Sequence, residues 1–246
     1  MTKSLSQADD RRKHDVSENY KIMTERIALA EQQAGRNPGE VELVAVTKTV
    51  PAALISHSIG MGVRHIGENR VQELNAKLPY LPADRIKISM IGHLQTNKVR
   101  AALSAASMIQ SVDSERLARE ISRIAAESGK TVECLVEVNI GNEAAKSGVE
   151  HELCEELIHK MSEMPGIKVL GLMAIPPVEA DIYKTRQYFF KLHKIFIDIC
   201  DKNRHNSNIN MRYLSMGMSS DYFEAILEGA NMIRVGSALY GARGDL

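Results

Sequence analysis

The chain of 246 residues is poor in the residues that mark specialised proteins. It has no tryptophan, aromatic residues make up only 4% of it, and its three cysteines, Cys134, Cys154 and Cys200, lie far apart. Three isolated cysteines form neither a disulfide framework nor a CxxC zinc signature, and they suit a reducing compartment. The eight histidines contain no HExxH pattern,. We therefore expect a cytoplasmic protein without a metal site.

The sequence also lacks an excess of either charge and any long apolar run. Lys and Arg together number 31, as do Asp and Glu, whereas a general nucleic-acid-binding protein needs surplus basic charge. No apolar run approaches the roughly 18 residues of a membrane-spanning helix. The polar segment 1–15 has no apolar core of the kind found in secretory signals, and we interpret it as a frayed tail. We expect neither nucleic acid nor a membrane as a partner.

Short apolar runs alternate with helical stretches through the rest of the chain. Apolar residues recur at helical spacing in these stretches, as at Leu117, Ile121 and Ile124,. The candidate strands are residues 42–48, 65–67, 86–92, 108–112, 132–140, 169–175, 213–218 and 232–236. Such alternation is typical of βαβ units in a parallel sheet. Eight strands in about 250 residues favour one α/β domain, a (β/α)8 TIM-like barrel over residues 16–246, with a doubly wound open sheet as the alternative.

The residues that close the strands have the greatest functional interest, because chemistry in such barrels occurs at the carboxyl ends of the strands. The first strand closes in AVTKTVP, where Val44, Val46 and Lys48 share one side,. If the valines fill the barrel, Lys48 points into its mouth. A desolvated lysine there would favour the neutral amine that attacks a carbonyl. The alternative is a lysine that extends its amine into solvent from the strand end.

Glycine and serine follow the last two strands. The segment LSMGMSSD (214–221) closes the seventh strand and IRVGS (233–237) the eighth. Backbone N–H groups at these positions often hold phosphate in barrels, although Ser219, Ser220 or Asp221 could instead cap the next helix. A lysine after the first strand together with an anion site after the last two suits pyridoxal phosphate, which has an aldehyde and a phosphate.

Seven segments resemble the pyridoxal phosphate homeostasis protein family, also called the YggS/PROSC family. They run in order between residues 41 and 243: AVTKTVP (45–51), IGENRVQE (66–73), IGHLQTNK (91–98), VEVNIGNEAAKSG (136–148), GLMAIPP (171–177), LSMGMSSD (214–221) and IRVGSALYGAR (233–243). The resemblance implies a single-domain barrel like the cofactor domain of alanine racemase, of the type III pyridoxal phosphate fold. It also implies storage or delivery of pyridoxal 5′-phosphate in the cell, without strong catalytic turnover.

The same resemblance implies roles for individual residues. Lys48 would carry the cofactor as a covalent aldimine, Arg234 would face the pyridine nitrogen, and Asn69 would lie near the ring. The phosphate would be held by Ser215, Gly236, Ser237 and the backbone of 217–219. No residue would be catalytic. Apo enzymes that use the cofactor would be its acceptors, and we expect a monomer.

Two other functions are alternatives: a racemase-like enzyme that uses the same cofactor, and a barrel enzyme acting on a phosphosugar, which would carry no yellow chromophore. A two-base racemase needs a second acid–base group opposite Lys48. In alanine racemase this group is a tyrosine from a second domain, which this sequence does not show. His93 and Tyr240 are the nearest candidates by strand position, and Tyr240 is expected to pack in the last helix.

Polar residues in and after the fifth strand have open roles. Glu137 and Asn139 alternate with apolar residues and are expected to point into the barrel, either toward a ligand or as polar filling,. Lys146 and Ser147 follow the same strand on the active face. Lys146 is either a solvated loop lysine or a second basic group that attracts an incoming phosphate.

Overall fold

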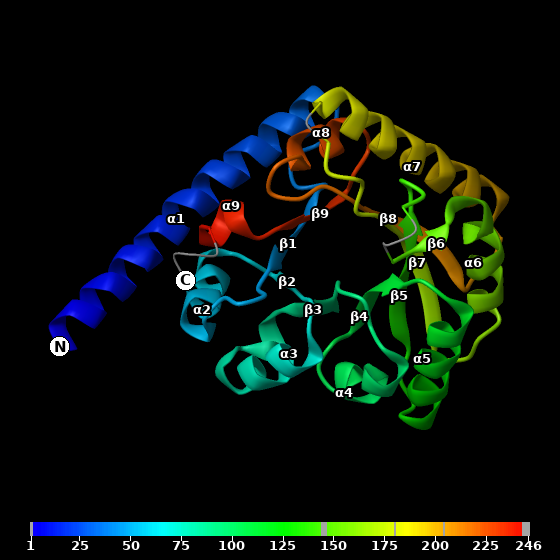
Figure 1. Ribbon diagram of the computed structural model, residues 1–246, viewed down its shortest axis with the longest axis horizontal. Coiled ribbons are helices and arrows are strands. Elements are labelled where there is room, and N and C mark those ends of the chain that lie inside the picture. Colours follow the sequence, from blue (N-terminus) through cyan, green and yellow to red (C-terminus); the bar gives the residue numbers. More distant parts are fainter. Residues whose placement is uncertain (1, 144–146, 180, 204, 243–246) are drawn as a thin grey trace.

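Eight parallel strands form a closed ring in the part of the chain that the structure describes, and Figure 1 looks into this ring. The structure, a computed structural model, describes residues 2–143, 147–179, 181–203 and 205–242. The ring strands are β1 (Glu42–Val46), β2 (His65–Glu68), β3 (Lys87–Met90), β4 (Met108–Val112), β5 (Val132–Asn139), β7 (Ile167–Met173), β8 (Ile209–Ser215) and β9 (Met232–Val235).

The strands follow chain order around the ring, β9 pairs with β1, and β4 pairs with β5. Because no gap is left between neighbouring strands of the ring, the predicted (β/α)8 barrel is confirmed and the open-sheet alternative is wrong. Each predicted strand is present, although β8 begins at Ile209 instead of residue 213. Its first half alternates buried with exposed polar residues such as Asn210 and Arg212, so it lacks the continuous apolar run that marks the other strands. A short strand, β6 (Val149–Glu150), pairs with β5 outside the ring.

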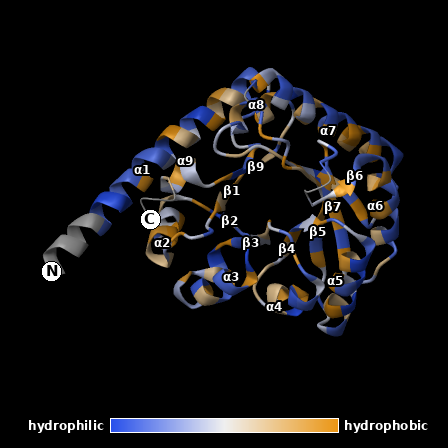
Figure 2. Ribbon diagram, in the orientation of Figure 1, coloured by the Kyte–Doolittle hydropathy of each residue, from blue (hydrophilic) through white to orange (hydrophobic). Residues whose placement is uncertain are grey.

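Helices surround the ring on its outer side (Figure 1). They are α1 (Thr2–Gln33), α2 (Ala52–Met61), α3 (Val71–Lys77), α4 (Val99–Leu103), α5 (Glu115–Glu127), α6 (Cys154–Ser162), α7 (Ile182–Lys202), α8 (Tyr222–Leu227) and α9 (Ser237–Tyr240). Figure 2 shows hydrophobic and hydrophilic residues interspersed along these helices, as expected for helices that bury one face,. Within the described ranges, no helix has both the length and the apolar character needed to span a membrane.

The segment 1–15, interpreted from the sequence as a frayed tail, is helical from Thr2 onward as the first part of α1, whose N-terminal end projects beyond the barrel (Figure 1). None of residues 9–15 is buried, and Val16 is the first buried side chain among those described, with 1% exposed. Met23 and Ile27 follow at helical spacing and are also buried. The polarity of the segment therefore predicts its exposure but not its conformation, since a helix can extend outward from a packed part by adding one hydrogen bond per residue.

The interior of the barrel is filled by side chains. Seven buried residues from the inner face of the ring form one cluster: Val44, Met108, Leu135, Leu170, Met173, Tyr213 and Met232. A second, larger cluster lies between the ring and the helices. Because the barrel is a packed core and not a pore, a small molecule can enter only at its ends.

Candidate binding site at the barrel mouth

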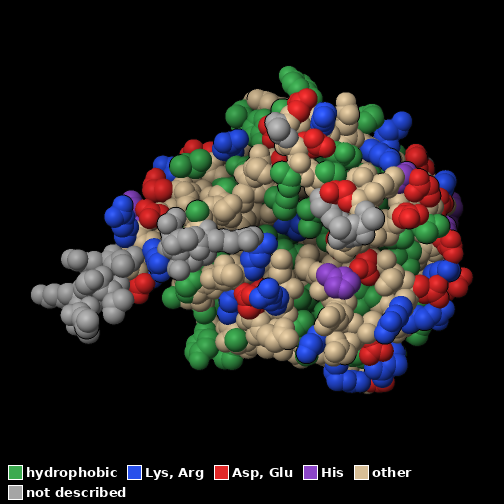
Figure 3. Space-filling view, in the orientation of Figure 1, with side chains coloured by type: hydrophobic (Ala, Val, Ile, Leu, Met, Phe, Trp, Pro, Cys, Tyr) green, Lys and Arg blue, Asp and Glu red, His purple; other side chains and the backbone are tan. Residues whose placement is uncertain are grey.

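A cavity of about 480 Å³ opens at the carboxyl ends of the strands. Its lining comes from the loops after most of the strands and includes Lys48, Asn69, His93, Glu137, Ser147, Ser219, Ser220, Arg234, Gly236, Ser237 and Tyr240. Figure 3 shows the mouth as a hollow with a basic side chain at its floor. Five of the six residues expected to bind the cofactor, Lys48, Asn69, Arg234, Gly236 and Ser237, therefore line one cavity, as their positions at strand ends predict.

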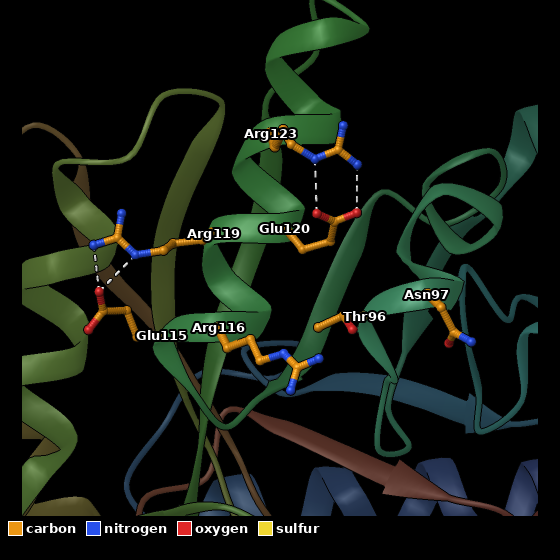
Figure 4. Close-up of a pocket in the computed structure, with 7 residues that line it drawn as sticks. All are labelled: Thr96, Asn97, Glu115, Arg116, Arg119, Glu120 and Arg123. Carbon is orange, nitrogen blue, oxygen red and sulfur yellow. Dashed lines mark hydrogen bonds and ion pairs between the residues drawn. The ribbon is translucent and has the colours of Figure 1, made fainter.

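A larger hollow of about 690 Å³ lies on the outer surface beside α5 (Figure 4). Four of its five charged lining side chains form ion pairs within the hollow: Arg119 with Glu115 at 2.5 Å and Arg123 with Glu120 at 2.7 Å. Exposed pairs of this kind contribute little energy and satisfy one another. The barrel mouth is the better candidate because its polar groups are buried and converge.

Lys48 lies on the cavity wall, two residues after the end of β1. Val44 belongs to the cluster inside the barrel and Val46 lines the cavity, so the predicted alternation is confirmed. The next residue, Thr49, has a φ of 63°, a left-handed conformation that is unfavourable for a β-branched residue. Its backbone N–H donates to the Glu73 carboxylate at 2.9 Å. This bond stabilises the sharp turn that follows Lys48.

A buried charge network behind the β1 loop escaped the sequence analysis. Glu68 is 0% exposed, and its Oε1 accepts hydrogen bonds from Thr47 Oγ1 at 2.8 Å and from Lys77 Nζ at 2.6 Å. Lys77 also donates to the backbone oxygen of Thr47 at 2.7 Å. The network joins β2 and α3 to the residue before Lys48. The one sign of it in the sequence is Glu68 of IGENRVQE, whose two partners lie in the loop after β1 and on α3.

Two backbone N–H groups converge on one oxygen at the ends of β8 and β9. Ser219 Oγ accepts from the N–H of Gly236 at 3.2 Å and from that of Ala238 at 3.1 Å. Gly217, with a φ of +91°, makes the turn that brings Ser219 there, and a Cβ on it would lie 2.6 Å from that of Ala225. The two predicted anion-binding segments therefore form one cluster of donors at the cavity wall.

The capping alternative for the residues after β8 is not found. Asp221 is the residue before α8, but none of the contacts described for it is a side-chain capping bond to that helix. Its carboxylate instead accepts the N–H of Met218 at 2.6 Å. Ser219 and Ser220 line the cavity. Asp221 therefore fixes the loop, and the two serines are left to face the cavity.

Arg234 is 3% exposed and lies at the inner wall of the cavity. Its guanidinium donates to Ser215 Oγ at 2.7 Å and to the Ala174 backbone oxygen at 2.9 Å. Burial lowers its pKa to about 10, so it stays charged at neutral pH. Ser215 is absent from the lining residues, is fully buried, and donates to Gln110 Oε1 at 2.8 Å. The structure therefore places Ser215 beneath Arg234 and not with the predicted phosphate-binding residues, because the inward-facing hydroxyl is taken up by the guanidinium.

The remaining predicted residues divide between the wall and the loops. Asn69 lines the cavity, and its backbone oxygen would be 2.6 Å from a Cβ on Gly92, so glycine is needed at that close approach. The amide of Asn139 bonds the backbone of Glu143 in both directions, at 2.9 and 3.1 Å. Asn139 is thus a structural residue of the loop. Lys146 lies outside the described residues.

Glu137 lies on the wall formed by β5. Its side chain is 5% exposed, and Oε1 accepts a hydrogen bond from Ser147 at 2.7 Å. Burial, the largest effect, raises the pKa of this carboxyl above its usual range. Its other oxygen has no hydrogen-bond partner among the described residues.

The two candidates for a second acid–base group differ in burial and in their hydrogen bonds. The Tyr240 hydroxyl is buried and shares a 2.8 Å hydrogen bond with Ser58, and burial raises its pKa to about 12. His93 is half-exposed at the rim, with Nδ1 3.0 Å from Asp113 Oδ2. The tyrosine is thus held as a packed, protonated hydroxyl, as its position in the last helix predicts.

Known proteins are similar to this chain in sequence and in fold over nearly its whole length. The family model for the alanine racemase N-terminal domain matches residues 19–244. The pyridoxal phosphate homeostasis protein of Aquifex aeolicus is 39% identical over 229 residues, 93% of this chain and 99% of that protein. A crystal structure of an unknown protein from Bifidobacterium adolescentis has a TM-score of 0.89 at 38% identity and covers 94% of this chain and 96% of that one. PipY of Synechococcus elongatus, with PLP bound, has a TM-score of 0.76 at 34% identity and covers 89% and 99% of the two chains.

Proposed function

Since this chain belongs to the alanine racemase N-terminal domain family and, within it, to the pyridoxal phosphate homeostasis proteins, we propose that it binds pyridoxal 5′-phosphate at the barrel mouth and stores or delivers it. The observation that carries the proposal is the convergence of a half-buried lysine, a buried arginine and paired backbone donors on one cavity. A related structure, that of PipY, holds the same cofactor.

The donors at the ends of β8 and β9 suit the phosphate. The N–H groups of Gly236 and Ala238 already point at one oxygen, that of Ser219. Anionic oxygens are stronger acceptors for such donors than a hydroxyl is. Ser237, exposed at the cavity edge, adds a hydroxyl to the set. We assign the phosphate to this cluster, with Ser219 in the role that the family resemblance implies for Ser215.

Lys48 and Arg234 suit the two ends of the cofactor ring. When bound, the cofactor supplies an aldehyde that reacts reversibly with amines, and we assign its covalent attachment to Lys48, with loss of one water. Arg234 would face the pyridine nitrogen. A guanidinium donates hydrogen bonds and keeps its proton, so this residue binds the ring without protonating it. Asn69, which follows β2 and so lies on the wall beside Lys48, would contact the ring.

We assign no catalytic residue. The side chain of Tyr240, one of the two candidate bases, is committed to Ser58, and its raised pKa disfavours the ionised form. A racemase-like enzyme remains the alternative function, and His93 is its only half-exposed candidate among the described residues of the cavity wall. The cysteines Cys134, Cys154 and Cys200 are free, which supports a cytoplasmic location,.

The decisive experiment is to mix the purified protein with pyridoxal phosphate, reduce it with borohydride and locate the adduct by mass spectrometry. We expect a yellow protein with the adduct on Lys48, no adduct or colour in Lys48→Ala, and both retained in Lys130→Ala. Lys130 is an exposed lysine that precedes β5, at the other end of the barrel. An adduct found only on another lysine would contradict the assignment, and an uncoloured protein would favour a phosphosugar barrel.

Two further assays separate storage, delivery and catalysis. Loaded protein mixed with an apo acceptor enzyme, in the presence of a trap for free cofactor, activates the acceptor only if transfer is direct. For catalysis, we expect no sustained conversion of L-alanine to D-alanine. Conversion that disappears in both Lys48→Ala and Tyr240→Phe would establish the racemase-like alternative.

A further inference from the structure

The two sides of the barrel mouth carry opposite charge. Arg234 on β9, Lys48 after β1 and the N–H groups near Gly236 lie on neighbouring strands and favour anions. Across the ring, Glu137 extends from β5, and Asp113 follows β4. In the strand order β1-β2-β3-β4-β5-β7-β8-β9, β5 is diametrically opposite β1. Figure 3 shows a histidine beside an acidic side chain over β3 and β4.

Glu137 is the one group on this acidic side that is buried within the cavity wall and incompletely paired among the described residues. It is 5% exposed and lines the cavity. Ser147 donates to Oε1, while Oε2 has no hydrogen-bond partner in the described part of the chain. A buried carboxylate oxygen without a donor is unfavourable. Such an oxygen beside a cavity is suited to a ligand that brings a donor.

The charges around Glu137 favour a cationic donor. Asp113 adds negative charge and, like burial, raises the pKa of Glu137, whereas Arg234 and His93 act in the opposite direction. Arg234 is already bonded to Ser215 and Ala174, and His93 to Asp113. Neither cation is hydrogen-bonded to Glu137. An ammonium group at Oε2 would supply both the missing hydrogen bond and the missing charge.

We infer that this side of the cavity is a cation subsite, in which Glu137 binds one ammonium group of an organic diamine whose other amino group reaches the cofactor aldehyde. The inference rests on the proposed function. A diamine is the class that fits, because the aldehyde is held on the Lys48 side and Glu137 lies across the ring. The near amino group replaces Lys48: its nitrogen bonds to the aldehyde carbon, the bond from that carbon to Lys48 breaks, and the proton lost by the incoming amine passes to the Lys48 amine.

The test compares three amines of equal length that differ at the far end: 1,4-diaminobutane, 1-aminobutane and 4-aminobutanoate. Displacement of the cofactor from Lys48 is followed by its absorbance. We expect half-displacement by the diamine at a concentration about 10-fold lower than by the monoamine, the effect of one charge-assisted hydrogen bond. The amine with a carboxylate should be the weakest. Equal behaviour of the diamine and the monoamine would overturn the inference.

Glu137→Gln keeps the size of the side chain and an oxygen for Ser147 but removes the charge, so the advantage of the diamine should disappear. Each variant is compared at its own measured cofactor content. Glu156→Gln, the same change on the exposed outer face of α6, should retain the full advantage. A diamine advantage that persists in Glu137→Gln would overturn the inference, because it would place the cation elsewhere.

A measurement without cofactor separates this inference from the proposed function. Cofactor-free protein is titrated with 1,4-diaminobutane by calorimetry, and binding should weaken in Glu137→Gln but not in Glu156→Gln. If the protein takes up no pyridoxal phosphate, the proposed function fails while this titration still decides whether the cation subsite exists. Binding that is absent, or equal in the wild-type protein and Glu137→Gln, would refute it.

Discussion

The barrel mouth and the outer face of α5 are both rich in charged side chains, but these side chains differ in burial and in pairing. On α5, Arg119 and Arg123 are more than half exposed, and each has a glutamate one helical turn away. At the mouth, Arg234 and Glu137 are almost wholly buried, and one oxygen of Glu137 has no partner among the residues that the structure describes. The outer hollow is the larger of the two. Burial and incomplete pairing, and not the size of a hollow, therefore mark the functional site.

The largest effect on stability is expected from breaking a buried pair at the mouth. Glu68→Ala leaves Lys77, which is 14% exposed, with only the longer 3.4 Å ion pair to Glu73, and should destabilise the fold by about 3 kcal/mol. The matched change on α5, Glu120→Ala, should cost less than about 0.5 kcal/mol. Urea unfolding of both variants measures the difference. Equal losses would show that burial does not separate the two regions.

A smaller effect, on cofactor affinity, is expected from filling the anion cluster. A Cβ on Gly236 would lie 3.3 Å from that of Val46, so Gly236→Val presses on β1 and narrows the cavity. Overpacking of this kind costs about 1–3 kcal/mol of free energy. Because the added side chain lies at the proposed phosphate site, we expect the affinity for pyridoxal phosphate to be at least tenfold weaker. Gly60→Val on α2, where nothing lies within 4 Å, is the control. An unchanged affinity in Gly236→Val would place the phosphate elsewhere.

Removing one hydroxyl should have a still smaller effect. Ser237→Ala deletes a side-chain donor but leaves the backbone N–H groups of Gly236 and Ala238 in place, so affinity should fall by about 1 kcal/mol, the net contribution of one hydrogen bond. Ser104→Ala, an exposed serine after α4, should bind normally. Loss of all binding in Ser237→Ala would mean that side chains, and not the backbone, hold the phosphate.

The pH dependence of stability should differ in sign between the two regions. Burial raises the pKa of Glu137 in the folded state, so its contribution to stability is present below its unfolded pKa and is lost as the pH rises through the folded value. Glu137→Gln should therefore gain stability relative to the wild-type protein as the pH rises from 4 to 7. Hydrogen bonding to Arg123 lowers the pKa of the exposed Glu120, and Glu120→Gln should show the opposite, salt-screened trend. Parallel unfolding curves would contradict this contrast.

The sequence predicts the residues that line the cavity better than the buried residues that lie behind them. Lys48, Asn69, Gly236 and Ser237 are found at the cavity because each closes a strand, and strand ends meet at the mouth by topology. Ser215 is different. It also stands at a strand end, but alternation along β8 points it inward, where Arg234 takes its hydroxyl. A motif places a residue on an element, whereas its hydrogen-bond partner depends on the neighbouring strand.

The sequence by itself determined the class of fold and the edge at which the site lies, since both follow from local periodicity and from the order of strands and helices. Only the tertiary structure decided which polar groups are satisfied. Both Glu68 and Glu137 keep one oxygen without a hydrogen-bond partner among the described residues. The other oxygen of Glu68 accepts from the Lys77 ammonium and Thr47, whereas that of Glu137, on the cavity wall, accepts only from the Ser147 hydroxyl among those residues. These two glutamates look alike in the sequence. Their difference arises from long-range contacts, because the energy of a buried charge depends on donors that distant segments bring to it.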